Sequence, residues 1–419
     1  MNDEFLTMDL ERLQEDLHSA LDEWHQPYRQ GSPLEGFYLY RKTFEEYKGN
    51  IQQATNQVLR QALKRLAQEN DEYANVLQSR YIDNEKVESA AGRMNFSEAT
   101  FHRKRNEALP ILAETVIRME REEQSRYRNQ MEVRLAPSSY ANYFGRADGI
   151  KNLISLLQAE TAPWIVTVVG IGGIGKTSMA DAVARRLIEW PTFREVGWVT
   201  ASQAVFNAGG HILSIDQPSL TAAGLVEKLC GQLLMGYATS AQRSQEESLA
   251  MLEQQLKSAP HLIVIDNLET VIDIETLLPL LRRLANPSKF LLTTRHSLYD
   301  EPDLYHLKVP ELEWKDALAL MRWEAAHRNI QSVSTAGDVD LYPIYETVGG
   351  NPLALRLVIG LLNRHPLKEH LDRSVGGNGA QIGAVCTHIY GHAWTRLDPV
   401  DRMYWSQLPP NIQPEAAAF

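Results

Sequence analysis

The sequence predicts a chain of several domains, in which a mainly helical N-terminal part precedes an α/β domain built on a parallel sheet. Residues 1–125 carry amphipathic helical patterns. From residue 164 onward, short apolar runs alternate with segments of helical periodicity. Between the first of these runs and the helix that follows stands "GIGGIGKT" (170–177), and an order of strand, glycine loop and helix is typical of α/β domains.

Size and composition indicate a cytoplasmic globular protein. The chain has 419 residues, 44% hydrophobic and 23% charged, with a formal net charge of −11. Its cysteines, Cys230 and Cys386, lie far apart and lack metal-ligand spacing, so neither a disulfide framework nor a zinc site is expected. The N-terminus is unlike a secretory signal, and no apolar run approaches the roughly 18 residues of a membrane span. The net acidity argues against a protein that coats nucleic acid over its whole surface, although a local basic face is compatible with it.

The stretch 170–177 fits the pattern G-x-x-x-x-G-K-[ST] of phosphate-binding loops. Glycines let successive backbone N–H groups turn inward around an anion at the N-terminus of a helix. Lys176 is expected to neutralise the β- and γ-phosphates, and the Thr177 hydroxyl to ligate Mg²⁺. The sequence therefore predicts a site for ATP or ADP with Mg²⁺, formed by Gly170, Gly172, Gly173, Ile174, Gly175, Lys176, Thr177 and Ser178.

A carboxylate for the metal ion is expected at the end of a second buried strand. "HLIVIDNLE" (261–269) places Asp266 directly after an apolar run that is typical of a parallel strand. Thr177 and Asp266 are therefore the predicted metal ligands. If hydrolysis takes place, Glu269 is the nearest candidate to polarise the attacking water, since Asn267 follows Asp266 directly.

Two further strands complete the expected sheet, "REVGWVTAS" (194–202) and "KFLLTTR" (289–295). The alternation of strands and helices at this spacing predicts a doubly wound parallel sheet. Arg295 comes at the carboxyl end of its strand, where ligands bind in such sheets. Arg295 is thus a candidate either for contact with a γ-phosphate or for a surface salt bridge.

Six motifs, taken in order, resemble those of STAND-class ATPases of the NB-ARC type, a family that includes plant disease-resistance proteins and apoptotic protease-activating factors. The motifs are "YFGRADGIKNLISLL", the glycine loop, "VGWVTAS", "LIVIDNLE", "FLLTTR" and "GGNPLALRLV", and the resemblance covers roughly residues 143 to 400. It implies a P-loop nucleotide-binding domain over 143–305, a small helical domain over 306–375 and the start of a winged-helix domain over 385–419.

The same resemblance implies roles for particular residues. Gly145 and Arg146 would lie near the base or ribose, Arg295 would read the γ-phosphate, and Pro352 would pack on the nucleotide. Asn267 departs from the family pattern, where a second acid is common, and favours a slow ATPase at most. The implied mechanism is a switch: ADP keeps the domains closed, and exchange for ATP opens them and lets copies of the chain associate.

Residues 71–125 resemble the helix-turn-helix domain of region four of bacterial sigma factors. "EKVESAAGRM" is expected to form one helix, "NFS" the turn, and Ser97 the N-cap of the next helix. The module is expected to bind double-stranded DNA through residues 84–106, with the contacts made by Glu98, Ala99, His102, Arg103, Lys104 and Arg105. A scaffold that docks a protein is the alternative, because the positive patch is short and the flanking helices are acidic. Residues 1–70 are predicted to be helical, and residues 126–142 to be a linker.

Three functions are compatible with these features. The first is a nucleotide-controlled transcriptional regulator that answers an unidentified trigger. The second is a bacterial immune-type sensor whose N-terminal module docks a protein partner or effector. The third is a general P-loop ATPase, such as a DNA-remodelling enzyme, and the Gly-x-Pro-Leu-Ala motif speaks against it.

Overall fold

The computed structural model describes most of the chain and divides it into two compact units, residues 1–130 with 189–191 and residues 131–188 with 192–419. The described residues are 10–26, 31–135, 138, 140, 142–189, 191–201, 204–206, 212–214, 220–234, 237, 243–268, 274–295 and 301–362. The expected winged-helix segment, 385–419, lies outside them.

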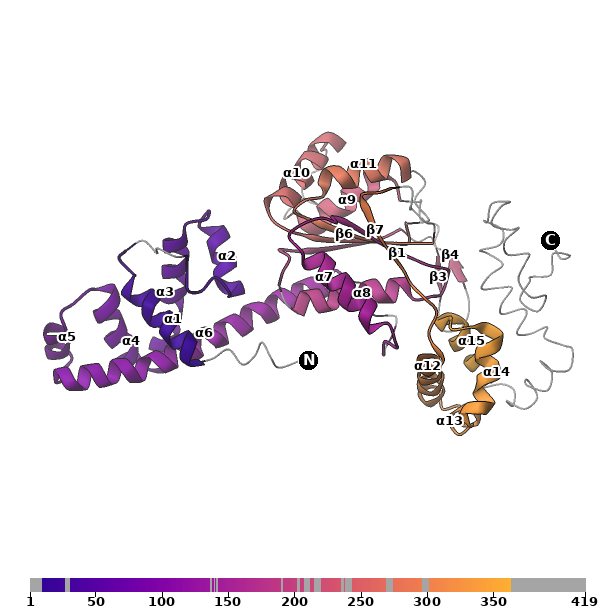
Figure 1. Cartoon of the computed structure of the whole chain (residues 1–419). Coiled ribbons are helices and arrows are strands. Elements are labelled where there is room, and N and C mark those ends of the chain that lie inside the picture. The colour runs from indigo at the N-terminus through magenta and orange to yellow at the C-terminus, as the bar shows by residue number, and fades with distance from the viewer. Residues whose placement is uncertain are drawn as a thin grey trace, which may run out of the picture. The chain divides into compact units, whose positions relative to one another are not determined.

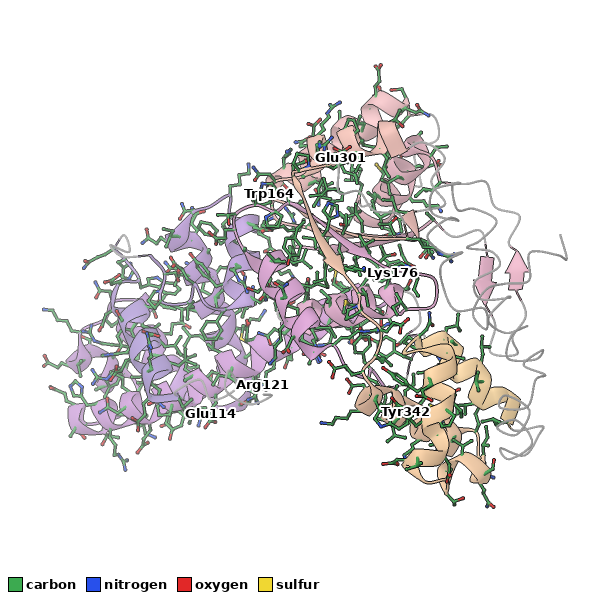
Figure 2. All side chains as sticks on the ribbon, turned by 45° about the vertical axis from the view of Figure 1, so that its right-hand side comes forward. Glu114, Arg121, Trp164, Lys176, Glu301 and Tyr342 are labelled. Carbon is green, nitrogen blue, oxygen red and sulfur yellow. The ribbon has the colours of Figure 1, made fainter. Side chains whose placement is uncertain are left out.

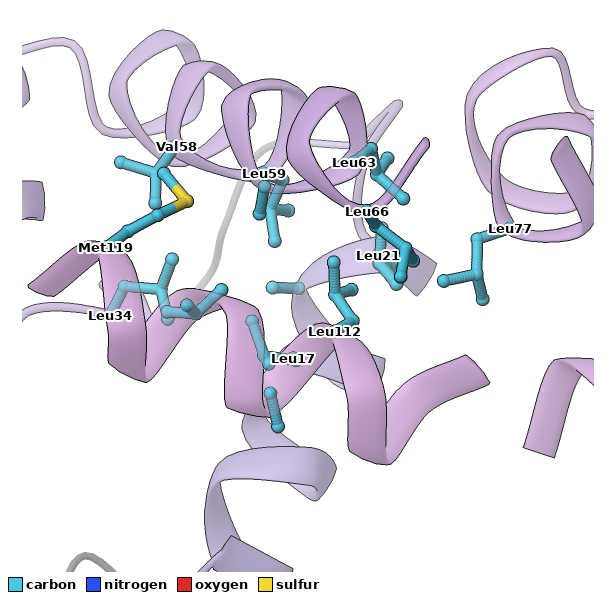
Figure 3. Close-up of a cluster of buried hydrophobic side chains, with 14 of the residues drawn as sticks. Leu17, Leu21, Leu34, Val58, Leu59, Leu63, Leu66, Leu77, Leu112 and Met119 are labelled. Atoms are coloured by element: carbon cyan, nitrogen blue, oxygen red, sulfur yellow. The ribbon is translucent and has the colours of Figure 1, made fainter. Parts of the chain in front are cut away.

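The first unit is helical, as the sequence predicts. Its elements are α1 (Leu10–Asp22), α2 (Tyr38–Glu46), α3 (Ile51–Glu69), α4 (Asp71–Leu77), the π-helix η1 (Gln78–Ile82), α5 (Val87–Arg93) and α6 (Glu98–Glu132), which extends past the unit's boundary. Apolar side chains recur every three or four residues along α1 and α3, so each helix presents one stripe to a shared core. Figure 3 shows that core, in which Leu17, Leu59 and Leu112 are fully buried.

A carboxylate from a distant helix begins α2. The N-cap residue Phe37 supplies no side-chain cap. Instead, Glu120 of α6 accepts hydrogen bonds from the backbone N–H groups of Tyr38 and Leu39, both at 2.8 Å. Glu120 is 7% exposed and also accepts from Gln124 Nε2 at 2.6 Å, so these three donors and the N-terminal end of the helix dipole stabilise its carboxylate. The contact fixes α2 on α6.

Helices α5 and α6 form the expected pair around a tight turn. Phe101 and Ala90 are fully buried in a small core with Val76 and Ala91. The Ser97 hydroxyl accepts from Thr100 N at 3.2 Å, which agrees with its predicted role as the N-cap. Beyond the turn, α6 continues without a break to Glu132, so the first part of the segment expected to be a linker is helical.

The second unit contains a parallel sheet in the order β2-β5-β6-β1-β7. The strands are β1 (Ile165–Val169), β2 (Val196–Thr200), β5 (Leu262–Asp266), β6 (Lys289–Thr294) and β7 (Leu304–Lys308), and a separate hairpin pairs β3 (Ala204–Phe206) with β4 (Ile212–Ser214). β7 was not predicted: it lies at the edge of the sheet, and its partly exposed residues lack the continuous apolar run of a central strand. It also extends the sheet past the domain boundary expected at residue 305.

Helices cover both faces of this sheet. They are α7 (Ala147–Gln158), α8 (Lys176–Glu189), α9 (Ala222–Leu233), α10 (Gln245–Ser258) and α11 (Ile274–Leu284). Figure 1 shows α9, α10 and α11 on one face and α7 and α8 on the other, which is the doubly wound arrangement. The central strands β1, β5 and β6 are fully buried, as strands covered on both faces must be.

A group of helices follows β7 within the same unit: α12 (Trp314–His327), α13 (Gln331–Ser334), α14 (Asp338–Val348) and α15 (Pro352–Leu362). They pack around their own apolar core, which includes Met321, Leu341 and Leu355. The buried Glu324 joins α12 to α15 by accepting a hydrogen bond from Arg356 at 3.0 Å. Across the parts of the chain that the structure describes, we find no helix with the length and apolarity that a membrane crossing requires.

Candidate phosphate-binding site

The glycine loop joins β1 to α8 as predicted, and Figure 2 shows Trp164 and Lys176 at opposite ends of β1. Gly173 and Gly175 have φ angles of +73° and +98°, which L side chains rarely adopt. Lys176 is 6% exposed, and its Nζ donates to the carbonyl oxygens of Gly170 at 2.9 Å and Ile171 at 3.2 Å. The lysine side chain thus lies along the inner side of the loop. Its ammonium group is next to the backbone of Gly170 and Ile171.

The predicted metal ligands lie together. The Thr177 hydroxyl donates to Asp266 Oδ1 at 2.7 Å, which links the start of α8 to the end of β5. Asp266 is 2% exposed. Oxygen ligands of this kind, one hydroxyl and one carboxylate, are those that Mg²⁺ takes in phosphate-loop sites.

Thr293 of β6 belongs to the same cluster, although nothing in the sequence singled it out. Its hydroxyl donates to Asp266 Oδ1 at 2.6 Å and accepts from the backbone N–H of Asn267 at 2.9 Å. Thr293 is fully buried. Its place at the carboxyl end of a strand, directly after the apolar run "FLL", is the one sequence signal that points to it.

Asn267 stands directly after Asp266 in a left-handed conformation, with φ of +61°. Asn tolerates this region better than most residues. Its side-chain Nδ2 donates toward Asp266 Oδ2 at 3.4 Å, so an amide faces the carboxylate where an acid would repel it. The other catalytic candidate on this segment, Glu269, lies outside the described residues.

Arg295 lies beside the loop. It follows the last residue of β6 and is exposed. A Cβ built on Gly172 would come within 3.5 Å of the Arg295 guanidinium, which places that group against the loop. The structure therefore brings Arg295 to the site, as predicted, from a strand more than a hundred residues along the chain from the loop.

Gly145 and Arg146, which lie directly before α7, bring a second arginine to the loop. Both have positive φ angles, +65° and +60°, and Arg146 precedes α7. Arg146 Nη1 donates to the carbonyl oxygen of Ile174 at 2.6 Å. Its Nε and Nη2 atoms are buried and have no hydrogen-bond partner among the described residues. Burial lowers the pKa of the guanidinium, and the adjacent Tyr143 hydroxyl opposes that shift.

The start of α15 lies on the loop. Pro352 is its first residue, and the neighbours of Pro352 make the contacts: Asn351 Nδ2 donates to Gly172 O at 2.9 Å, and Leu353 N donates to Gly173 O at 3.3 Å. Asn351 is fully buried and was not among the predicted site residues. The sequence does not single out Asn351, because its partner lies in a distant segment of the chain.

The residues present fit a nucleoside phosphate with Mg²⁺. Arg146 contacts the loop through Nη1 and has two further buried donor atoms without a partner among the described residues, and the loop glycines make close approaches that a Cβ would block. A buried lysine, a hydroxyl and a carboxylate complete the set, in Lys176, Thr177 and Asp266. Strand, loop, helix and carboxylate strand in this arrangement define a P-loop NTPase domain.

Comparison with known proteins narrows that class. Residues 146–331 match the family model described as the NB-ARC domain. This match supports an NB-ARC-type P-loop ATPase domain of the STAND class over that part of the chain. Residues 43–113 match a second model, described as a protein of unknown function, DUF1492.

Among curated proteins, the chain is similar to the disease resistance protein RPP8 of Arabidopsis thaliana, with 26% identity over 273 residues. The match covers 62% of this chain and 28% of that protein, so the chain spans less than a third of the relative's length. A STAND protein with a tetratricopeptide repeat sensor from Pyrococcus horikoshii matches 52% of the chain and 30% of its own at 16% identity, with a TM-score of 0.35. The Drosophila ORC structure bound to DNA matches 68% of this chain and 71% of that chain at 12% identity, with a TM-score of 0.36.

The candidate DNA-contacting residues lie at the start of α6, in the first unit. An exposed face one helical turn long is formed by Glu98, Ala99, His102 and Arg103. Lys104 is held within the module instead: its Nζ donates to Glu72 at 2.8 Å and lies over the Phe96 ring at 5.2 Å. Arg105 is half-buried and donates to Asn106. Of the predicted cations, Arg103 is therefore the one that lies most openly on that face.

Proposed function

We propose that the chain is a nucleotide-controlled switch that binds ADP or ATP with Mg²⁺ on the glycine loop. The observation that carries the proposal is that Lys176, Thr177 and Asp266 lie together at the carboxyl end of the parallel strands while the start of α15 contacts the same loop. Lys176 would neutralise the phosphates, and Thr177 and Asp266 would hold the Mg²⁺ that offsets their charge. A group of helices that touches the loop directly is well placed to respond to what the loop holds.

Slow hydrolysis suits this arrangement. Asn267 offers Asp266 an amide donor and cannot act as a general base. Arg295, which lies beside Gly172, would contact a γ-phosphate that only ATP carries. In the proposed cycle ADP holds the closed form, and ATP opens it and promotes self-association.

Replacement of the loop lysine tests nucleotide binding. We expect Lys176→Ala to abolish binding of ADP and ATP in an equilibrium titration, because the phosphates lose their principal counter-charge. Lys228→Ala removes an exposed lysine from α9 and should bind like the wild type. Circular dichroism should show both variants folded, and a folded Lys176→Ala protein that retains wild-type affinity would contradict the proposal.

For the first unit, we propose that the exposed face at the start of α6 contacts double-stranded DNA, so that the switch controls a transcriptional regulator. Support comes from the short turn between α5 and α6, the small-residue core around Phe101, and the exposure of His102 and Arg103. The internal pairing of Lys104 with Glu72 leaves a smaller positive face than the sequence suggested. Docking of a protein partner, as in an immune-type sensor, is the competing role.

Binding to duplex DNA at low salt separates these two roles. We expect affinity that falls steeply with salt and is lost in the double variant Arg103→Ala, Arg105→Ala. A matched pair on the same helix, Arg118→Ala with Arg121→Ala, should bind like the wild type. A wild-type chain that binds no duplex at low salt would favour protein docking instead.

A further inference from the structure

Asn351 links the phosphate loop to α15 through both ends of one side chain. Its Nδ2 donates to Gly172 O at 2.9 Å. Its Oδ1 accepts from the backbone N–H groups of Leu353 at 3.1 Å and Ala354 at 3.3 Å, which makes it the N-terminal cap of α15. The residue is fully buried, so breaking either contact leaves a polar group without water to replace it.

The backbone that carries Asn351 is held in place by the segment that leads into α12. Leu312 N donates to Gly350 O at 2.8 Å, and Gly350 N donates to Glu311 Oε2 at 3.1 Å. A Cβ at Gly350 would lie 2.0 Å from Leu312 O, so no other residue fits this approach. Asn351 is therefore attached to the helical group and follows its movements.

On the side of the phosphate loop, the hydrogen bond between Asn351 and Gly172 depends on the backbone conformation of the loop glycines. A Cβ on Gly173 would lie 2.7 Å from Leu353 Cβ and 2.9 Å from Asn351 Oδ1, so the loop and α15 meet at van der Waals distance. Gly172 presents its carbonyl to Asn351, while Arg295 lies beside its Cα. A rotation of the Gly172 peptide would carry the carbonyl away from the amide and break the bond.

We propose that Asn351 is the positioning residue that couples the phosphate loop to the helical group, and that its amide bond to Gly172 slows the release of ADP. The inference rests on the proposed nucleotide switch. The bond exists only while α15 lies on the loop, so it stabilises the arrangement that covers the phosphates. Its loss lets α15 leave the loop more readily and opens a path for the nucleotide.

Two substitutions separate the bond to the loop from the helix cap. Asn351→Ser and Asn351→Asp both keep an oxygen that caps α15, since Ser and Asp are good N-caps, and both lack the donor to Gly172. Asp adds a charge near the phosphates and Ser does not. The inference therefore requires that both variants release nucleotide faster than the wild type. Thr221→Ala is the matched control, because Thr221 caps α9, which packs on the β2 side of the sheet.

The experiment measures release of a fluorescent ADP analogue into excess ADP, together with the melting temperature of each variant. We expect both Asn351 variants to release the analogue about tenfold faster than the wild type, as for the loss of one buried hydrogen bond, with Thr221→Ala at the wild-type rate. Release at the wild-type rate in both Asn351 variants overturns the inference. Equal acceleration by Thr221→Ala overturns it too, because release then follows stability. A wild-type chain that binds no ADP in the preceding titration overturns the switch itself.

Discussion

At the scale of single residues, the site is organised around the Asp266 carboxylate. One of its oxygens accepts hydrogen bonds from the hydroxyl groups of Thr177 and Thr293, and the other faces the Asn267 amide. Hydrogen bonds of this kind hold a buried carboxylate in one orientation. The predicted Mg²⁺ ligand is thus held in place by its protein neighbours.

Thr293 provides a residue-scale prediction. We expect Thr293→Val, which keeps the shape and removes the hydroxyl, to weaken nucleotide affinity by about tenfold in the presence of Mg²⁺, because Asp266 loses a charge-assisted hydrogen bond. Thr293→Ser retains the hydroxyl and should bind like the wild type. Titrations with Mg²⁺ and with a chelator check this, and an equal loss under both conditions would show that the hydroxyl does not act through the metal ligand.

The sequence predicted the residues of the site whose spacing is local, and it missed those defined by distant contacts. Lys176 and Thr177 follow from one motif, and Asp266 from the end of one apolar run. Thr293 and Asn351 owe their positions to partners 27 and 179 residues away, which no local pattern encodes. Lys104 shows the converse, since a cation chosen for DNA contact on charge alone is paired with a glutamate of another helix.

At the scale of elements, a capping contact connects two helices of the first unit, α2 and α6. We expect Glu120→Ala to cost about 2 kcal/mol, because two backbone donors at the start of α2 lose a buried charged acceptor. Glu122→Ala, which removes an exposed pair with Arg65, should cost less than about 1 kcal/mol. Urea unfolding followed by hydrogen exchange within Tyr38–Glu46 measures both, and equal costs would contradict a capping role for Glu120.

His261, directly before β5, allows a prediction of how the folding stability of the second unit depends on pH. Burial lowers the pKa of His261 from 6.5 to about 4. At pH values between these two pKa values, His261 is protonated in the unfolded chain and neutral in the folded chain. Folding stability therefore falls as the pH drops from 6.5 to 4. The contribution of this residue is about 3 kcal/mol across that window.

His261→Gln should show a shallower loss of stability over the same pH range, since the substituted side chain does not titrate. Denaturant midpoints for the wild type and the variant between pH 7 and 4 provide the comparison. Parallel curves would mean that other groups control the acid response of this unit.

At the scale of the whole molecule, most elements follow from sequence pattern, and the exceptions have physical causes. The central strands are continuous apolar runs, and the loop, caps and helical periodicities locate their neighbours. The edge strand β7 was missed because its half-exposed residues carry no strong pattern. Helix α6 continues to Glu132, past residue 126 where the sequence predicts a linker, because polar residues are compatible with a solvent-exposed helix as well as with a linker.

We propose that the P-loop domain holds a nucleotide and that self-association of the chain depends on whether this nucleotide is ADP or ATP. The most direct measurement is the identity of the nucleotide extracted from the purified protein, together with the mass of the protein in ADP and in ATP. We expect close to one equivalent of tightly held ADP, and a larger species once ATP replaces it. A protein that purifies without nucleotide, turns ATP over rapidly and keeps one mass in both nucleotides would contradict it.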